Sequence, residues 1–442
     1  MPDQTRANDR ENQRAEKARP QFSHAWFEMA ALLIVLGLLT DQRALFALAA
    51  CLLTVIPISW WWNRMSLRHV EYERRFDKQC AFPGETVEMT TRITNRKLLP
   101  LSWLEIGDEI PMALPLTRGA LLPTHAPRIG KLPLVLSLRW YERVSRRYEL
   151  DCTARGIYKL GPVELRSGDI FTLFETRQSH GHHDRLIVYP RIWPMEELGL
   201  PSKEPFGERK AHRRVLKDPL RTIGIRDHRP EDSLRHIHWK ATAHRGELQV
   251  RVFEPTTTLT LAILLNVCTL EFSWQGVLPE LFERTIGTAA SIATWAVGQK
   301  YNVGLIANGS LPLSDQPIRV LPGRSPDQLA LVLEALAAVT SFATSSIHEL
   351  LRYESPRLPW GATLVVVTAI VTDDLATMLL RLRDAGRRLA LVSLAEDPPP
   401  SLDGIAAYHL PSSMHAFQGG PHSATAALRA AGLGPRWEAT GG

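Results

Sequence analysis

The stretch ALFALAACLLTVIPISWWW, from Ala44 to Trp62, holds 19 residues and no charged side chain. At about 1.5 Å per residue, a helix of this length matches a hydrocarbon core about 30 Å thick. Three tryptophans end the stretch, as in the aromatic belt at a membrane interface, and Arg64 and Arg68 follow. The sequence therefore predicts a membrane-spanning helix here.

The residues before this stretch predict a second, shorter span. Phe22 to Leu39 is apolar apart from a few positions, and Thr40 to Arg43 forms a polar turn. Glu28 would lie near the interface, where a charge costs little. We therefore expect two antiparallel transmembrane helices over 22–62, after a disordered tail at 1–20.

A cleaved leader is the alternative interpretation, because Leu48-Ala49-Ala50-Cys51 resembles a lipoprotein cleavage box. Eleven more uncharged residues follow Cys51, where a mature lipoprotein would begin with polar residues, so the span is favoured. Lys and Arg flank the two predicted helices, and the turn between them holds only Arg43. The positive-inside rule then places the soluble bulk in the cytoplasm, on a multi-pass protein of the inner membrane.

The composition predicts two or three packed domains beyond the membrane segment. The chain has 442 residues, of which 45% are hydrophobic, and a net charge of +6. Its four cysteines, Cys51, Cys80, Cys152 and Cys268, form no C-x-x-C pair, so a disulfide framework or structural zinc site is not expected.

Residues 67–195 carry the pattern of an immunoglobulin-like antiparallel β-sandwich. Period-two alternation predicts strands, and turn residues such as Pro83-Gly84 and Gly161-Pro162 separate them. The predicted strands are Thr86–Ile93, Trp103–Ile106, Leu132–Leu138 and Arg146–Cys152. Such a fold offers edges and loops for binding and carries no chemistry of its own.

Residues 257–411 alternate strand and helix patterns, which predicts an α/β domain with a mostly parallel sheet covered on both faces. The predicted strands are Leu259–Val267, Tyr301–Ala307, Thr363–Ala369 and Leu389–Leu394; the predicted helices are Leu278–Val297, Asp327–Val339 and Asp373–Ala385. Ser325 and Thr372 stand as N-caps and Gly386 as a helix stop. The Gly-, Ala- and Ser-rich residues 412–442 predict a flexible tail.

The segment 226–254, RDHRPEDSLRHIHWKATAHRGELQVRVFE, resembles the signature of the bacterial family called domain of unknown function 58. RGIYKLGPVELRSGDIFTLFE (155–175) and LIVYPRIWP (186–194) resemble two further signatures of that family. The resemblance implies a pair of membrane helices, a sandwich and a von Willebrand factor A-like domain. It also implies association with MoxR-type AAA+ ATPases and transglutaminase-like membrane proteins. Glu231, Ile170 and Thr172 depart from the family pattern.

The resemblance also implies a magnesium site, which this sequence lacks in its usual form. A von Willebrand factor A domain holds Mg²⁺ with D-x-S-x-S after its first strand and with residues from later loops. Asn266, Cys268 and Leu270 replace the three ligands of that motif, and Thr368 stands at a later position. Without the carboxylate the main attraction for a hard cation is missing. We therefore expect a degenerate metal site, with no metal and no cofactor.

The signature itself allows two interpretations. It can form a polar platform for a partner, or it can join the two soluble domains with its tryptophan in a core and its charges in a buried network. The residues concerned are Arg226, Pro230, Asp232, Arg235, Trp239 and Lys240. They lie in a predicted basic linker, 196–256, and thirteen Lys and Arg against seven Asp and Glu between Lys203 and Arg251 account for the whole net charge.

Other chemistry has weaker support. Asp232, His236 and His238 could form the site of a metal-dependent hydrolase, but no third ligand with suitable spacing accompanies the two histidines. The cluster His180, His182, His183 and Asp184 is typical of a solvated loop. No phosphate-binding glycine loop is present. Interspersed acids and the lack of aromatic side chains interleaved with the basic ones in this linker favour a membrane surface or an acidic partner over nucleic acid.

These features together predict a membrane-anchored adaptor rather than an enzyme. We expect it to act with a MoxR-type AAA+ ATPase in the assembly or maturation of a cell-envelope or other protein complex. The metal-dependent hydrolase is the alternative, and bound zinc or manganese would distinguish the two.

Overall fold

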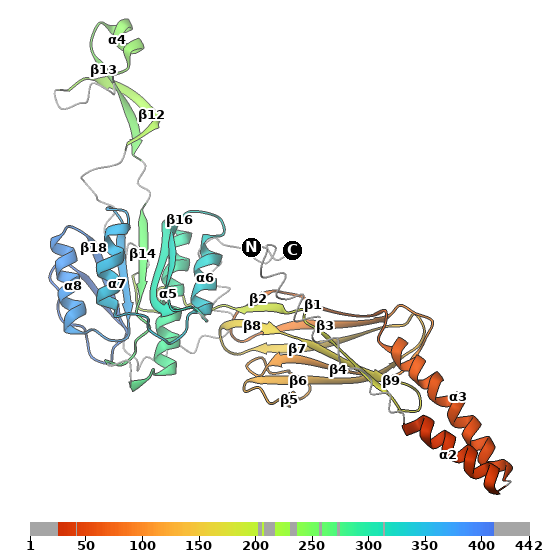
Figure 1. The fold of residues 1–442 in the computed structure, drawn as a ribbon. Coiled ribbons are helices and arrows are strands. Elements are labelled where there is room, and N and C mark those ends of the chain that lie inside the picture. The colour runs from red at the N-terminus through yellow and green to blue at the C-terminus, as the bar shows by residue number, and fades with distance from the viewer. Residues whose placement is uncertain are drawn as a thin grey trace. The chain divides into compact units, whose positions relative to one another are not determined.

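The computed structural model describes residues 25–40, 42–201, 206, 217–229, 237–255, 259–271, 275–312 and 314–410. The chain divides into two compact units, the first reaching Tyr189 and the second beginning at Pro190. Figure 1 shows both units. The predicted tails, 1–20 and 412–442, lie outside the described residues.

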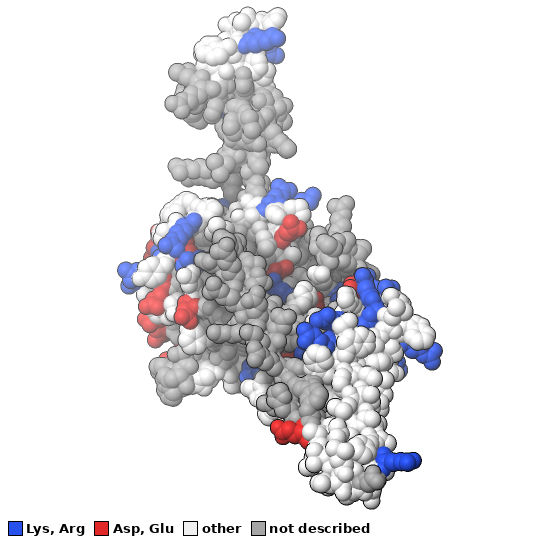
Figure 2. All heavy atoms as spheres, turned by 45° about the vertical axis from the view of Figure 1, so that its right-hand side comes forward, with Lys and Arg blue, Asp and Glu red and all other residues white. Residues whose placement is uncertain are grey.

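The first unit begins with two apolar helices, α2 (Ala25–Thr40) and α3 (Arg43–Ser66). They pack side by side, and Gly37 allows the close approach, because a Cβ there would lie 3.3 Å from the Leu45 Cβ. Figure 2 shows the pair as an almost uncharged column. Among the described residues, α3 alone is long and apolar enough to cross a membrane. The apolar helix over Ala44–Trp62 is thus confirmed and extends to Ser66, whereas the 16-residue α2 leaves a second span a prediction.

Three sheets form the rest of the first unit, here called the β-sheet domain. Their orders are β1-β3-β7, β10-β9-β4-β6-β5 and β2-β11-β8, and among the described strands of this domain only the short β2–β11 pair is parallel. The bounds are β1 Val70–Phe76, β2 Cys80–Ala81, β3 Glu85–Asn95, β4 Leu101–Pro111, β5 Leu122–Pro123, β6 Ile129–Leu138, β7 Arg143–Cys152, β8 Gly156–Leu160, β9 Val163–Gly168, β10 Glu175–His180 and β11 Asp184–Val188.

Alternation decides which side of each strand is buried. In β3, Val87, Met89 and Ile93 are fully buried and Thr91 is nearly so, whereas the side chains at the alternate positions are partly exposed. The four strands predicted from the sequence are all present, each longer than predicted. The antiparallel architecture is thereby confirmed, and its classification as immunoglobulin-like stays a prediction.

The second unit contains a six-stranded sheet in the order β16-β15-β14-β17-β18-β19, here called the α/β domain. The pairs are parallel except β15–β16, which is antiparallel, so the predicted, mostly parallel sheet is confirmed. The bounds are β14 Thr260–Leu265, α5 Pro279–Gly298, β15 Asn302–Ser310, β16 Pro317–Gly323, α6 Gln328–Ala338, α7 Ile347–Glu354, η3 Ser355–Arg357, β17 Thr363–Thr368, α8 Asp373–Asp384, β18 Arg388–Ser393 and β19 Ala406–His409.

Helices cover this sheet. Leu351 of α7 and Leu379 of α8 share one apolar cluster with Leu264 of β14 and Val366 of β17. Helix α5 packs on α6 and on the same central strands, on the other face. Thr372 caps α8 as predicted, its hydroxyl accepting from the Leu375 amide at 3.3 Å. The cap predicted for α6 is wrong: the helix begins later, after Asp327, because Ser325 accepts the Gln328 amide in a preceding turn.

The second unit also contains a hairpin within the predicted basic linker. Strands β12 (Lys217–Asp227) and β13 (Gln249–Pro255) pair antiparallel, and helix α4 (Trp239–Arg245) lies between them in the chain. These three elements are called the signature hairpin below.

Candidate functional site

The signature hairpin is held together around Gln249, which is fully buried. Its side-chain amide donates to Asp227 Oδ1 at 2.6 Å, and its backbone N–H donates to Thr242 Oγ1 at 3.0 Å. Gly246 ends α4 in the left-handed conformation, with φ 74°, and its N–H donates to the Thr242 carbonyl. Gln249, the first residue of β13, therefore fixes the position of α4 on the hairpin through Thr242 and Asp227.

Trp239 is the first residue of α4 and is 68% exposed. Lys240 beside it is exposed too, and Arg226 donates from Nη1 to the Asp227 carbonyl at 3.0 Å. An exposed tryptophan fits the platform interpretation of the signature better than the buried-core one. Pro230, Asp232 and Arg235 lie outside the described residues.

His238 is the N-cap of α4, and its Nδ1 accepts the Ala241 amide at 3.1 Å. The Nδ1 atom of His238 is therefore already occupied as a hydrogen-bond acceptor and is not available to a metal in the hydrolase alternative. Asp232 and His236 lie outside the described residues. Within the described part of the chain, no group of three or more His, Cys, Asp or Glu is placed to hold a metal ion.

At the carboxyl edge of the α/β sheet, three buried polar side chains bond to one another. Asn266 donates from Nδ2 to Thr368 Oγ1 at 3.0 Å, and its Oδ1 accepts from Asn308 Nδ2 at 2.9 Å. Asn308 Oδ1 accepts from the Val267 amide at 2.8 Å, and Thr368 Oγ1 donates to the Ile370 carbonyl at 2.6 Å. Asn266, Asn308 and Thr368 are at most 3% exposed, and they are called the amide network below.

The amide network contains two of the residues, Asn266 and Thr368, that were compared with the cation site of a von Willebrand factor A domain, and its chemistry does not fit Mg²⁺. Asn266 brings a neutral amide, and its Oδ1 already accepts from Asn308 and from the Cys268 amide at 3.2 Å. Its Nδ2 donates to the hydroxyl that a cation would need. Hard cations are held by carboxylates and free oxygens, neither of which these residues offer. Burial raises the pKa of the Cys268 thiol, which keeps it neutral and a poor ligand.

Sequence analysis identified three of these residues but missed Asn308. Asn266, Cys268 and Thr368 do come together, whereas Leu270 lies further along the loop in the wall of an adjacent groove. Asn308 follows a buried apolar run within β15, and such a polar interruption near a strand's carboxyl end was the available signal.

An open groove of about 1130 Å³ lies at this edge of the sheet. Loops after β14, β17 and β18 line it together with the start of α5. The charged side chains in its wall are predominantly acidic: Glu271, Glu280, Asp373, Glu396 and Asp397, with Arg284 as the counterpart. The groove therefore offers a negative surface beside a closed polar network.

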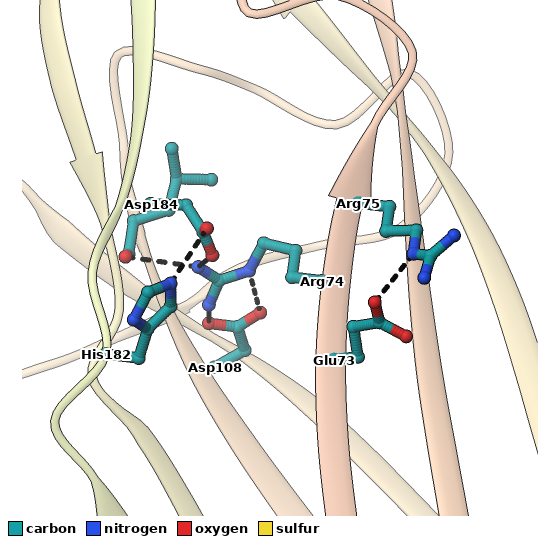
Figure 3. A network of polar contacts seen from close by, with 7 residues as sticks. Glu73, Arg74, Arg75, Asp108, His182 and Asp184 are labelled. Atoms are coloured by element: carbon teal, nitrogen blue, oxygen red, sulfur yellow. Dashed lines mark hydrogen bonds and ion pairs between the residues drawn. The ribbon is translucent and has the colours of Figure 1, made fainter. Parts of the chain in front are cut away.

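A buried ion network in the β-sheet domain escaped sequence analysis. Figure 3 shows Arg74 of β1 between Asp108 of β4 and Asp184 of β11. The Arg74 guanidinium contacts both Asp108 oxygens, donates from Nη1 to Asp184 Oδ2 at 2.7 Å and to the Leu160 carbonyl at 3.1 Å. Tyr72 donates to Asp108 Oδ2 at 2.7 Å. The network thus connects one strand from each of the three sheets.

The cluster His180–Asp184 was expected in a solvated loop, but Asp184 is the first residue of β11 and bonds to the buried Arg74. His182 Nε2 lies 3.3 Å from Asp184 Oδ1, but its side chain is 83% exposed. Burial lowers the pKa of Arg74, and the opposing effect of Asp108, Tyr72 and Asp184 outweighs it and raises the pKa. Arg74 is therefore a permanent cation in the interior, with a structural role.

The comparisons with known proteins give one distant relative. The chain is 25% identical over 369 residues to the uncharacterized protein YeaD of Bacillus subtilis (strain 168), covering 81% of each chain. No family model matches. Solved structures give the sporulation control protein Spo0M of Bacillus subtilis (TM-score 0.19, 14% identity, 30% of this chain and 54% of that one) and a β-glucosidase of Listeria innocua (TM-score 0.17, 12% identity, 27% and 16%). At these TM-scores neither likeness bears on this chain. What the comparisons establish is distant homology to a bacterial protein, YeaD.

Proposed function

We propose that this chain is a membrane-anchored adaptor without a catalytic centre, which acts with a MoxR-type AAA+ ATPase in assembling or maturing a protein complex. Its soluble units would face the cytoplasm, and a transglutaminase-like membrane protein is a second expected partner. The domain of unknown function 58 resemblance motivates both partners, and the following contacts support the adaptor role.

The amide network is the observation that carries the proposal. A cation-dependent binding domain needs a carboxylate with free oxygens at this edge, and here the buried groups satisfy one another. Buried polar groups that hydrogen-bond only to one another stabilise the local structure and leave no donor or acceptor for a ligand. The edge therefore keeps the rigid form of a binding face without the means to hold an ion.

Two exposed features support protein recognition. The acidic groove beside the amide network would attract a basic surface, and charge complementarity accelerates association. Trp239 presents a large aromatic side chain at the start of α4, and tryptophan frequently dominates binding energy at interfaces. Both features lie in the second unit.

Photo-crosslinking in intact membranes tests the proposal. A benzophenone amino acid at Trp239 should give adducts with an AAA+ ATPase, identified by mass spectrometry. The matched control is Leu321 of β16, which is 72% exposed and lies outside the signature hairpin. Adducts at Trp239 no more abundant than at Leu321, or without any ATPase among them, would contradict the adaptor role.

Metal analysis of the purified full chain separates the adaptor from the hydrolase. The adaptor should contain zinc or manganese far below one equivalent. Stoichiometric metal that is lost in a His236→Ala variant would instead support the alternative centred on Asp232, His236 and His238.

A further inference from the structure

The strand register brings three turns of the β-sheet domain to the end where α3 enters. Val70, the first residue of β1, pairs with Asn95 at the end of β3, and Thr94 pairs with Arg143 at the start of β7. Leu101 pairs with Leu138, and Gly168 pairs with Glu175. The β3–β4, β6–β7 and β9–β10 turns therefore lie at this one end and are called the anchor-end turns below.

The anchor-end turns expose large apolar side chains. Trp140, Tyr141 and Phe171 are between 55% and 65% exposed, and Leu98 is 73% exposed. Ile170 at 56% adds to the β9–β10 turn. Single exposed apolar residues are ordinary, but a group gathered at one end of a domain marks an interaction surface.

These side chains are held outward by an ordered turn rather than a loose loop. Asp169 is 1% exposed and accepts from the Phe171 amide at 3.0 Å and from the Phe174 amide at 2.8 Å. Phe174 packs inward at 6% exposure, whereas Phe171 points to solvent. Thr172 between them has φ 56°, a conformation that costs a β-branched residue energy. The chain thus maintains a strained turn whose result is an exposed phenylalanine.

The same turns are joined to the end of the apolar helix. Lys97 of the β3–β4 turn donates to the carbonyls of Met65 at 2.9 Å and Arg68 at 2.8 Å, and also contacts the Ser66 carbonyl. Helix α3 also contacts β9 and β10, which flank the Phe171 turn. The anchor-end turns therefore lie at the level of the helix end, where the three tryptophans place the interface.

Positive charge accompanies the apolar side chains. Arg64, Arg68 and Arg139 are exposed at this end. Figure 2 shows Lys and Arg side chains gathered where the uncharged helix pair meets the rest of the unit. Exposed aromatics with cations at the end of a membrane helix match the headgroup region of an anionic bilayer.

We propose that the anchor-end turns are a second membrane contact, in which Trp140, Tyr141 and Phe171 enter the headgroup region and the arginines bind anionic phospholipid. This inference rests on the membrane anchoring within the proposed function. It explains why the Ile170–Phe171 turn remains apolar and rigid although it faces away from the core. The β-sheet domain would then be seated on the bilayer.

Lipid photo-crosslinking tests the proposal on the full chain in vesicles of phosphatidylcholine mixed with phosphatidylglycerol. A benzophenone amino acid is placed singly at Trp140, at Phe171 and at Leu122. Leu122 is a matched control, since it is 52% exposed but lies in β5, at the opposite end of β6 from Leu138. A fourth probe, at Leu48 on the exposed side of α3, reports the anchor itself.

We expect Trp140 and Phe171 to form lipid adducts several-fold more abundantly than Leu122, and their yield to rise with the share of phosphatidylglycerol. Adducts at Leu48 but none above the control at Trp140 and Phe171 would overturn the second contact and leave the anchor intact. No lipid adduct at Leu48 would overturn both. Adducts of Phe171 to a protein in native membranes, in place of lipid, would assign the turns to a partner instead.

Discussion

Among single residues, Arg74 has the most demanding environment in the β-sheet domain. Its side chain is 1% exposed and its charge is balanced by Asp108, at 2%, and Asp184, at 23%. Burying an ion pair costs desolvation free energy that the mutual attraction roughly offsets, whereas removing one partner leaves an uncompensated charge. Replacing only one partner of the pair Arg74–Asp108 should therefore lower the free energy of unfolding more than replacing both.

We predict that Arg74→Leu lowers the free energy of unfolding by about 3–5 kcal/mol. The double variant Arg74→Leu/Asp108→Leu should recover part of that loss, because it no longer leaves Asp108 buried and unpaired. Chemical denaturation of the detergent-solubilised chain measures both. Arg75→Leu is the control: this neighbour is 62% exposed and pairs only at the surface with Glu73, so its effect should be small. Equal losses in the single and double variants would contradict this view of the network.

A second prediction concerns Asn266. Asn266→Asp removes the donor to Thr368 and places a carboxylate at a site 3% exposed, so we expect a loss of about 1–3 kcal/mol in unfolding free energy. Thermal unfolding with and without Mg²⁺ checks it, with Asn302→Asp at the partly exposed start of β15 as the control. A large Mg²⁺-dependent gain in the wild type would argue against a closed amide network.

For single residues, the sequence predicted contacts where a known motif marks the positions. It did not predict contacts between residues that are far apart in the chain and belong to no motif. Asn266, Cys268 and Thr368 stand at motif positions, so their proximity could be predicted. Arg74 meets its partners 34 and 110 residues away, and one basic residue in an alternating strand looks like any solvent-facing one. The exposure of Trp239 was equally undecided, because nothing in its neighbours fixes which side of α4 is covered.

Among the elements, the link between α3 and β1 depends on Lys97, whose Nζ occupies the carboxyl end of the helix. Last-turn carbonyls otherwise need water or a capping group, and the Lys97 amine supplies the hydrogen-bond donor. The helix ends where the β3–β4 turn supplies this donor. Elements with strong alternation or a clear cap, such as β3 and α8, were predictable, while the short β16, α7 and β19 were not, since their patterns are too brief to separate from loops.

Lys97 makes stability depend on pH. Burial lowers its pKa from 10.5 to about 8. Below pH 8 both folded and unfolded chains hold the proton; between about 8 and 10.5 only the unfolded chain does, so its contribution to stability rises with pH across that window. Thermal unfolding on both sides of pH 8 should show this rise, and Lys97→Met should remove it. Lys78→Met, at an exposed position, should retain the wild-type slope; a slope unchanged in Lys97→Met would exclude Lys97 as its origin.

For the molecule as a whole, the proposed membrane attachment depends on α3. Replacing Leu48 and Leu53, which are 50% and 41% exposed on this helix, by lysine should cost about 2.5–3.5 kcal/mol each on insertion and shift the chain out of the carbonate-resistant membrane fraction. The same change at Leu32 and Val35 of α2 decides between one span and two, because only a spanning α2 would respond equally. A double lysine variant of α3 that remains fully membrane-bound would contradict the anchor.

The division into units was only coarsely visible in the sequence. The change from alternating to helical periodicity separates the β-sheet domain from the α/β domain, and that much follows from local pattern. The signature hairpin could not be predicted in this way, because a basic, turn-rich segment has the pattern of a linker and only the pairing of β12 with β13 shows a hairpin.

Only Leu67, Arg68 and His69 separate α3 from β1, and Leu67 is buried in the same apolar cluster as Val70 and Leu104. Because this connection is short and partly buried, a change in the tilt of α3 and a rotation of the sheets occur together. With α3 in a bilayer, as proposed, a rotation of the sheets would change the tilt of this helix in the lipid. Conversely, a change in bilayer thickness would change the tilt of α3 and, with it, the orientation of the sheets relative to the membrane.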